Sequence, residues 1–167
     1  MNEKSMDELF PPGVIGFPVT PFNQDHSLDL AGFAKNLEII LAKPFTAFVA
    51  AGGTGEMYSL SRDEYLAVIR SAVEKTNGTM PIIAGVGYGS RIVQIMASEA
   101  EKIGASAILV LPPYYTNACF DGVLAYLKGI GQATSLPLIL YTRDWLQINP
   151  EEAERLAEEV PTLRGWK

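Results

Sequence analysis

Six short apolar runs recur along the chain, separated by longer segments that mix apolar and polar residues. The first five runs contain no charged residue and include β-branched or aromatic side chains. The runs are "VIGFPVT" (14–20), "FTAFVAA" (45–51), "MPIIAGV" (80–86), "SAILVLP" (106–112), "LPLILY" (136–141) and "LRGWK" (163–167). Nearly continuous apolar runs of this length are typical of parallel strands that are buried on both faces. We therefore predict six strands of one parallel sheet.

The segments between these runs have the period of amphipathic helices. Residues 30–41 carry one apolar stripe at three- and four-residue intervals, formed by Leu30, Phe33, Leu37, Ile40 and Leu41. Residues 92–103 and 122–133 complete the set of helix-period segments. We expect a helix between each pair of successive strands.

Two helix starts are marked by capping residues. Ser61 is followed three residues later by Glu64, which is the pattern of a capping box. Asn149 precedes Pro150, and Glu152 completes a second box with a proline in the first turn. These positions predict helices that begin just after residues 61 and 149.

The strand ends are regularly spaced. Taken at Thr20, Ala50, Val86, Leu111, Tyr141 and Lys167, they lie 25 to 36 residues apart. This is the repeat of a β/α unit, and both a doubly wound sheet and a (β/α)8 barrel satisfy it. A whole barrel typically needs roughly 250 residues, whereas this chain supplies five β/α units and a sixth strand. If the fold is a barrel, residues 1–167 form the N-terminal part of one barrel domain.

Composition and charge narrow the class of protein. A chain of 167 residues that is 48% hydrophobic can bury a substantial core in one domain. The first ten residues lack the apolar centre of a secretory signal, and the single Cys119 cannot form an internal disulfide, so we expect a cytoplasmic protein. No apolar run approaches the length of a membrane span. The net charge of -6 argues against nucleic acid or an anionic membrane as the main partner, but permits an anionic substrate in a locally positive pocket.

A glycine-rich loop follows the second predicted strand. In "AAGGTGE" (50–56), the glycines allow several backbone amides to point toward one ligand, and Thr54 adds a hydroxyl donor. Such a loop can hold a carboxylate or a phosphate, although a tight turn without a ligand has the same spacing. No Walker sequence follows, and "GVGYG" (85–89) lacks the spacing of a dinucleotide fingerprint. Nucleotide binding is therefore weakly supported.

A tyrosine and a lysine end the last two predicted strands. Leu163, Gly165 and Lys167 occupy alternate positions, so they share one face, and Gly165 leaves space beside the lysine. Neighbouring strands lie about 5 Å apart, which brings Tyr141 beside Lys167. An apolar pocket disfavours an ammonium ion, and the free amine can attack a carbonyl to form a Schiff base while the tyrosine moves protons. The alternatives are a solvated lysine tail and a tyrosine that only packs at the rim.

Other catalytic classes find little support in the sequence. His26 is the only histidine and lies in a polar turn, and Cys119 has no cysteine or histidine neighbour, so no metal site is predicted. The nucleophile elbow of serine hydrolases is missing as well.

Several motifs in register resemble those of a known superfamily. They are "GFPVTPF" (16–22), "AAGGTGE" (50–56), "GVGYG" (85–89), "LPPYY" (111–115), "YTRD" (141–144) and "GWK" (165–167). Their order and spacing resemble the dihydrodipicolinate synthase and N-acetylneuraminate lyase superfamily of Schiff-base TIM barrels. The glycine-rich loop, together with Arg143 and Asp144 after Tyr141, is most similar to the 5-dehydro-4-deoxyglucarate dehydratase subgroup. The resemblance extends from Val14 to the last residue.

The resemblance implies roles for specific residues. Lys167 matches the lysine that forms the Schiff base with a 2-oxo acid, and Tyr141 matches the tyrosine that transfers protons. Gly53 and Thr54 match the loop that grips the substrate carboxylate. In the synthase and lyase branches, the position of Gly53 usually carries a hydroxyl residue that joins a proton relay, so its absence here argues against those branches.

Substrate, partners and cofactors follow from the same resemblance. Arg143 is implied to bind the substrate, and Tyr115 matches a tyrosine that reaches a neighbouring subunit's site in the synthase, so we expect a homo-oligomer, a dimer or a tetramer. The similar dehydratases convert 5-dehydro-4-deoxyglucarate, a 2-oxo sugar acid, to 2,5-dioxopentanoate with loss of water and carbon dioxide. They act in sugar-diacid catabolism and need no metal or organic cofactor.

Two alternatives remain open from the sequence. One is another Schiff-base aldolase or synthase of the same superfamily, and the other is a non-catalytic half-barrel that binds a partner or a small oxo acid. Because relatives of this type continue through strands seven and eight, we expect the chain to be part of a longer enzyme. Six strands alone would leave two open edges prone to aggregation.

Overall fold

Six parallel strands form a single sheet in chain order. The computed structural model describes residues 10–113 and 117–167. The strands are β1 (Val14–Gly16), β2 (Phe45–Ala50), β3 (Ile82–Val86), β4 (Ala107–Val110), β5 (Leu138–Leu140) and β6 (Leu163–Trp166). Each strand pairs in parallel with the next, so the sheet order is β1-β2-β3-β4-β5-β6.

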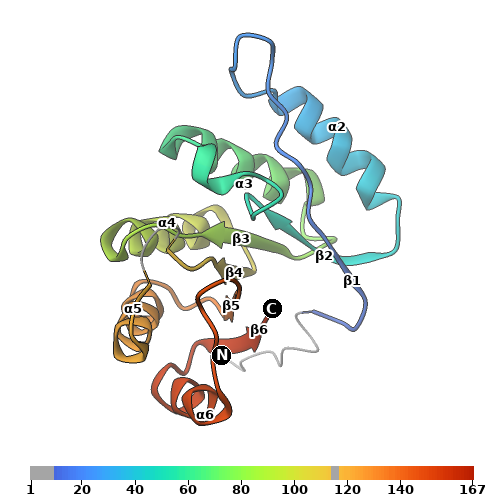
Figure 1. Cartoon of the computed structure of the whole chain (residues 1–167). Helices are drawn as coiled ribbons and strands as arrows, with labels where there is room; N and C mark the ends of the chain where they lie inside the picture. Colours follow the sequence, from blue (N-terminus) through green and yellow to red (C-terminus); the bar gives the residue numbers. More distant parts are fainter. Residues whose placement is uncertain (1–9, 114–116) are drawn as a thin grey trace.

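The helices lie along one side of this sheet. They are α2 (Leu30–Leu41), α3 (Arg62–Thr76), α4 (Ser90–Ile103), α5 (Phe120–Ala133) and α6 (Pro150–Glu159), with a short 3-10 helix, η1 (Met57–Ser59), after β2. In Figure 1 they follow one another around the outside of the curved sheet, from α2 at the top to α6 at the bottom. A doubly wound sheet changes its strand order and carries helices on both faces. The observed arrangement is instead that of the first six strands of a (β/α)8 barrel, as predicted.

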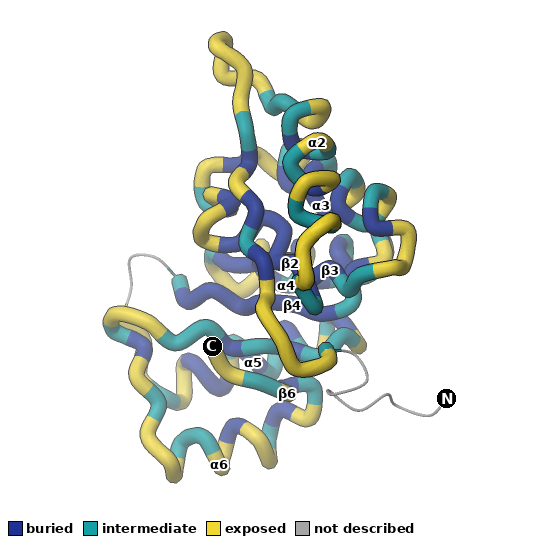
Figure 2. Tube along the Cα trace, turned by 90° about the vertical axis from the view of Figure 1, so that its right-hand side faces the viewer, coloured by how far each residue is buried: buried dark blue, intermediate teal, exposed yellow. Residues whose placement is uncertain are grey.

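The core lies between the sheet and its helices. Phe33 of α2, Phe48 of β2 and Leu127 of α5 are fully buried. Figure 2 shows that β2, β3 and β4 run through the buried part of the molecule, whereas the segment that ends at the C-terminus is more exposed. Burial of one large apolar side chain contributes about 1.5–3 kcal/mol, so the packing between sheet and helices supplies much of the stability of this scaffold.

The helix starts agree with the capping residues in the sequence. The Ser61 side chain accepts a hydrogen bond from the Glu64 amide, and the Asn149 side chain accepts one from the Glu152 amide. Both glutamate carboxylates in turn accept a hydrogen bond from the backbone amide of the capping residue, so both predicted capping boxes are confirmed. The apolar stripe of α2 is confirmed in part, because Phe33 and Leu37 are buried whereas Leu30 is exposed.

The strands are shorter than the apolar runs predicted. The first ends at Gly16 and not at Thr20, and Pro18, which lacks an amide proton for the ladder, follows two residues later. The fifth begins at Leu138, directly after Pro137. No helix in residues 10–113 or 117–167 is both long enough and apolar enough to cross a membrane.

Candidate active site

The inner face of the sheet forms one cavity. Its volume is about 410 Å³, and each of the six strands contributes to its wall. The lining residues are Phe10, Ile15, Phe17, Val49, Ile83, Leu109, Ile139, Gly165, Trp166 and Lys167. Gly165 and Lys167 both line the cavity, as their alternation in the sequence predicted. Leu163, which was expected on the same face, is instead buried in the core, because the pairing of β5 with β6 shifts register between Leu138 and Ile139. Among the described residues, Lys167 is the single charged side chain in this wall, so an amine stands at the edge of an otherwise apolar space.

Lys167 packs against Tyr141 at the carboxyl end of the sheet. Its Nζ atom lies 3.8 Å from the centroid of the Tyr141 ring, which confirms the predicted adjacency of the two side chains. Hydrogen bonds to β5 and to Thr142, just after it, hold the backbone of Lys167. The Lys167 amide donates to the Leu140 carbonyl at 2.9 Å. The Lys167 carbonyl accepts from the Thr142 amide at 2.9 Å and from the Thr142 hydroxyl at 3.1 Å. The backbone at the base of the side chain is therefore fixed, although Lys167 as a residue is exposed.

A second aromatic ring contacts the same amine. The centroid of the Phe17 ring lies 4.9 Å from the Lys167 Nζ atom. Our sequence reasoning did not select Phe17 as a site residue, because it precedes Lys167 by 150 positions. Its alternation with Ile15 was an available signal, since both side chains line the cavity.

The glycine-rich loop after β2 lies at the same carboxyl edge. It is closed by a hydrogen bond from the Glu56 amide to the Gly53 carbonyl at 3.1 Å. The buried Thr20 hydroxyl donates to the Gly55 carbonyl at 2.7 Å and ties the loop to the segment after β1. Gly53 and Thr54 are exposed and do not line the cavity, and the Thr54 hydroxyl has no hydrogen-bond partner within residues 10–113 and 117–167. Their exposed polar groups are available to a ligand.

Several residues at this edge have unusual backbone conformations. Ala51, Glu56, Tyr88 and Asp144 have φ angles of 48°, 54°, 73° and 52°, a left-handed region that costs non-glycine residues free energy. The loop also lies very close to β3, because a Cβ atom added to Gly85 would stand 2.1 Å from the Ala51 carbonyl oxygen. Strain of this kind persists where the surrounding structure fixes it, so the strand-end loops are held in defined positions.

A tyrosine network joins three of these loops. The Tyr58 hydroxyl donates to the Pro112 carbonyl at 2.6 Å, the Tyr88 hydroxyl to the Met57 carbonyl at 3.3 Å, and the Tyr126 hydroxyl to the Tyr88 carbonyl at 3.0 Å. The rings of Tyr58 and Tyr88 meet edge to face at 4.9 Å. Burial raises the pKa of Tyr58 and Tyr126 above the ordinary value, so both hydroxyls remain protonated donors at neutral pH. Sequence reasoning missed this network, since no local spacing pattern indicates it.

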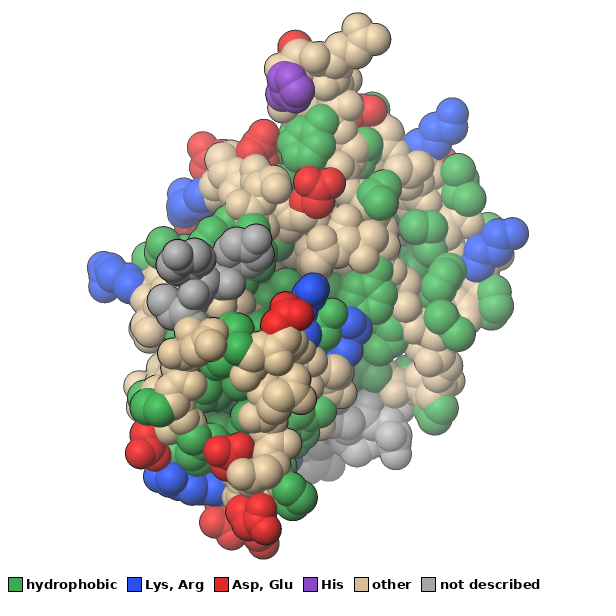
Figure 3. Space-filling model, viewed as in Figure 1, with side chains coloured by type: hydrophobic (Ala, Val, Ile, Leu, Met, Phe, Trp, Pro, Cys, Tyr) green, Lys and Arg blue, Asp and Glu red, His purple; other side chains and the backbone are tan. Residues whose placement is uncertain are grey.

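Arg143 is an exposed residue that lies next to Tyr141. Its Cζ atom is 5.8 Å from the centroid of the Tyr141 ring, and its Nε atom donates to Asp144 at 2.7 Å. That hydrogen bond raises the pKa of the Arg143 guanidinium. Figure 3, which has the same view as Figure 1, shows basic and acidic side chains beside hydrophobic ones near the middle of the face toward the viewer. Tyr115, the remaining predicted substrate residue, falls outside the described residues.

The titratable residues give no indication of a metal centre in the described part of the chain. Within residues 10–113 and 117–167, no three His, Cys, Asp or Glu side chains gather closely enough to hold an ion. The chemistry that the geometry favours is that of an amine next to a tyrosine, at the mouth of an apolar cavity.

Comparisons with known proteins agree with this geometry. The model of the dihydrodipicolinate synthetase family matches residues 11–167. The chain is 39% identical over its whole length to a probable 5-dehydro-4-deoxyglucarate dehydratase of Bradyrhizobium diazoefficiens, of which it covers 53%. It is also 39% identical over its whole length to a protein of the same name from Ectopseudomonas mendocina, of which it covers 55%.

Solved structures show the same architecture. A crystal structure of dihydrodipicolinate synthase matches 93% of this chain with a TM-score of 0.88 and 30% identity, and 55% of that structure is covered. The chloride-inhibited dihydrodipicolinate synthase of Acinetobacter baumannii, solved in complex with pyruvate, matches 93% of the chain with a TM-score of 0.87 and 34% identity, over 54% of its own length. The chain thus spans about half the length of the relatives that it matches. The family match across nearly all of its residues, and the identity to these relatives, establish that the chain belongs to the dihydrodipicolinate synthetase family.

Proposed function

We propose that this chain carries the Schiff-base centre of a lyase that acts on a 2-oxo sugar acid. The observation that carries the proposal is the Lys167 amine, 3.8 Å from the Tyr141 ring centroid at the mouth of an apolar cavity. The amine attacks the keto carbon, water leaves, and the resulting iminium withdraws electrons from the neighbouring carbon. Tyr141 transfers the protons that these steps require.

The substrate that we propose for this lyase is 5-dehydro-4-deoxyglucarate. This proposal is supported by the names of the relatives from Bradyrhizobium and Ectopseudomonas and by glycine at position 53, where the synthase and lyase branches usually carry a hydroxyl. Gly53 and Thr54 bind the carboxylate beside the keto group, and Arg143 binds the carboxylate at the other end. Water and carbon dioxide leave, and 2,5-dioxopentanoate forms without a metal or organic cofactor. The reaction belongs to sugar-diacid catabolism in the cytoplasm, and the enzyme is a homo-oligomer.

Reductive trapping tests the covalent step. Borohydride added to the natural protein that contains this chain, together with a 2-oxo acid, should attach the reduced adduct to Lys167. A Lys167→Arg variant should give no adduct, while a Lys128→Arg variant, changed on the outer helix α5, should react normally. An adduct mapped to Lys43, Lys75, Lys102 or Lys128 would contradict the assignment.

Turnover separates the proposed dehydratase from an aldolase or synthase of the same family. We expect the keto-deoxy-diacid to release carbon dioxide and 2,5-dioxopentanoate. Condensation or release of pyruvate with an aldehyde as the faster reaction would instead assign the chain to an aldolase or synthase branch.

A further inference from the structure

Phe17 lies against the one atom on which the proposed chemistry depends. Its ring and that of Tyr141 lie 4.9 Å and 3.8 Å from the Lys167 Nζ atom, each measured to the ring centroid. Both distances are within the roughly 6 Å over which a ring face attracts a cation. No carboxylate of the described residues forms an ion pair with Lys167. Aromatic faces, and not an acid, are therefore the closest favourable partners of a positive charge at this nitrogen.

The Phe17 ring lies next to the glycine-rich loop. Gly52, in the loop after β2, lies beside it, since a Cβ atom added to Gly52 would be 3.7 Å from the Phe17 Cδ1 atom. Three residues further along, the Thr20 hydroxyl anchors the same segment to the Gly55 carbonyl. The ring thus lies between the proposed carboxylate loop and the amine, in a segment that is tied to that loop.

We propose that Phe17 is a catalytic residue whose ring face stabilises the cationic iminium nitrogen formed on Lys167. The inference rests on the proposed function. In the covalent step, the neutral amine and the keto group combine with one proton to give an iminium ion and one water molecule, so the nitrogen becomes positively charged. The negative face of an aromatic ring attracts such a charge but cannot accept its proton. The rings also attract the ammonium ion that must first lose its proton, but more weakly than a carboxylate at the same place would, and they do not compete for the proton of the iminium.

Stepwise fluorination of Phe17 tests this role. Fluorine withdraws charge from the ring face while it changes the ring's size very little. Mono-, di- and trifluorophenylalanine would be placed at position 17 of the natural protein that contains this chain. The fraction of Lys167 trapped by borohydride would then be measured against the concentration of pyruvate. At an alkaline pH, where the ammonium form that the same ring attracts is minor, we expect the apparent constant for iminium formation to fall with each fluorine, by about 2- to 5-fold over the series.

A matched control uses Phe22, which lies in the same segment, is exposed and makes no ring contact with Lys167. Fluorination there should leave the constant unchanged. A constant that is insensitive to fluorination at position 17, with normal trapping at Lys167, would overturn the role of Phe17 and leave the proposed function intact. Failure of the unsubstituted protein to form any adduct at Lys167 would overturn both.

Discussion

The contact between β3 and the glycine-rich loop predicts a severe effect of one added methyl group. In a Gly85→Ala variant, the new Cβ atom would stand 2.1 Å from the Ala51 oxygen, 2.8 Å from the Ala51 carbonyl carbon and 2.9 Å from the Gly52 Cα atom. All three are backbone atoms, so no side chain can rotate away. The loop or the strand must move by about 1.4 Å for the methyl group to reach an ordinary van der Waals distance of about 3.5 Å from the Ala51 oxygen.

The expected loss of stability follows from two opposing terms. Overpacking in a filled interior typically costs about 1–3 kcal/mol, and a clash with rigid backbone belongs at the upper end of this range. Replacement of glycine by alanine in a strand recovers about 0.5–1 kcal/mol of backbone entropy. We therefore expect the free energy of unfolding to fall by about 2 kcal/mol, measured by urea denaturation followed by circular dichroism.

A Gly53→Ala variant is the matched control. A Cβ atom added to Gly53 has no heavy atom within 4 Å, so the same change three residues into the loop should alter stability by less than about 0.5 kcal/mol. Because the close contact with Gly85 positions the glycine-rich loop, the Gly85→Ala substitution should also raise the KM for the 2-oxo acid. If Gly85→Ala unfolded at the same urea concentration as the unsubstituted protein, the argument that β3 fixes the loop would be refuted.

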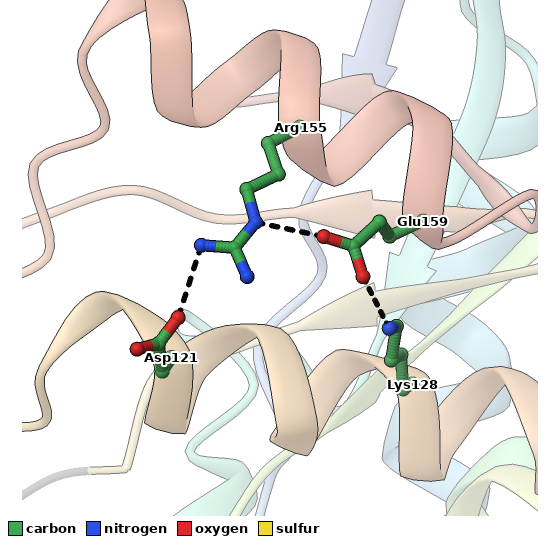
Figure 4. A network of polar contacts seen from close by, with 4 residues as sticks. All are labelled: Asp121, Lys128, Arg155 and Glu159. Carbon is green, nitrogen blue, oxygen red and sulfur yellow. Dashed lines mark hydrogen bonds and ion pairs between the residues drawn. The ribbon is translucent and has the colours of Figure 1, made fainter.

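Three further changes test other parts of the molecule. Tyr141→Phe should keep the fold and lower kcat by roughly 100- to 10,000-fold, the range for a positioned acid-base group; near-normal turnover would restrict Tyr141 to packing. Asn149→Ala should remove the α6 cap and cost about 1 kcal/mol in the free energy of unfolding, and an unchanged melting temperature would contradict this. Glu159 accepts hydrogen bonds from Lys128 and Arg155 (Figure 4), which lower its pKa. The ionised Glu159 thus stabilises the fold above the ordinary carboxyl pKa range, and this stabilisation is lost as pH falls through the lowered pKa. Glu159→Gln should therefore lower the melting temperature at pH 7 and have little effect in acid. An equal change in melting temperature at pH 7 and in acid would refute the assignment.

The parts of the fold that depend on local rules could be predicted from the sequence. Ser61 and Asn149 cap helices because a capping box needs only residues three positions apart. The adjacency of Tyr141 and Lys167 followed from the geometry of neighbouring strands, which is the same in any parallel sheet. The ends of the strands were less predictable, because Pro18 and Pro137 limit the ladder within runs that contain no charged residue.

The missed features depend on the curvature of the sheet or on the course of the loops. Phe17 meets Lys167 across the inner face only because the six strands bend toward one another. Tyr58 finds the carbonyl of Pro112, and Tyr126 that of Tyr88, across loops whose course no spacing pattern specifies. Such contacts join residues that are 38 to 150 positions apart, with no local signal in common.

The left-handed residues at the carboxyl edge have a consequence for laboratory evolution. Ala51, Glu56 and Tyr88 each hold a conformation that glycine would adopt at about 1 kcal/mol less. Selection for heat resistance alone would therefore favour glycine at these positions, while selection for turnover would retain side chains that keep the loops rigid. Libraries screened under the two pressures should diverge first at this edge, and the positions where they diverge would map the region in which stability and catalysis compete.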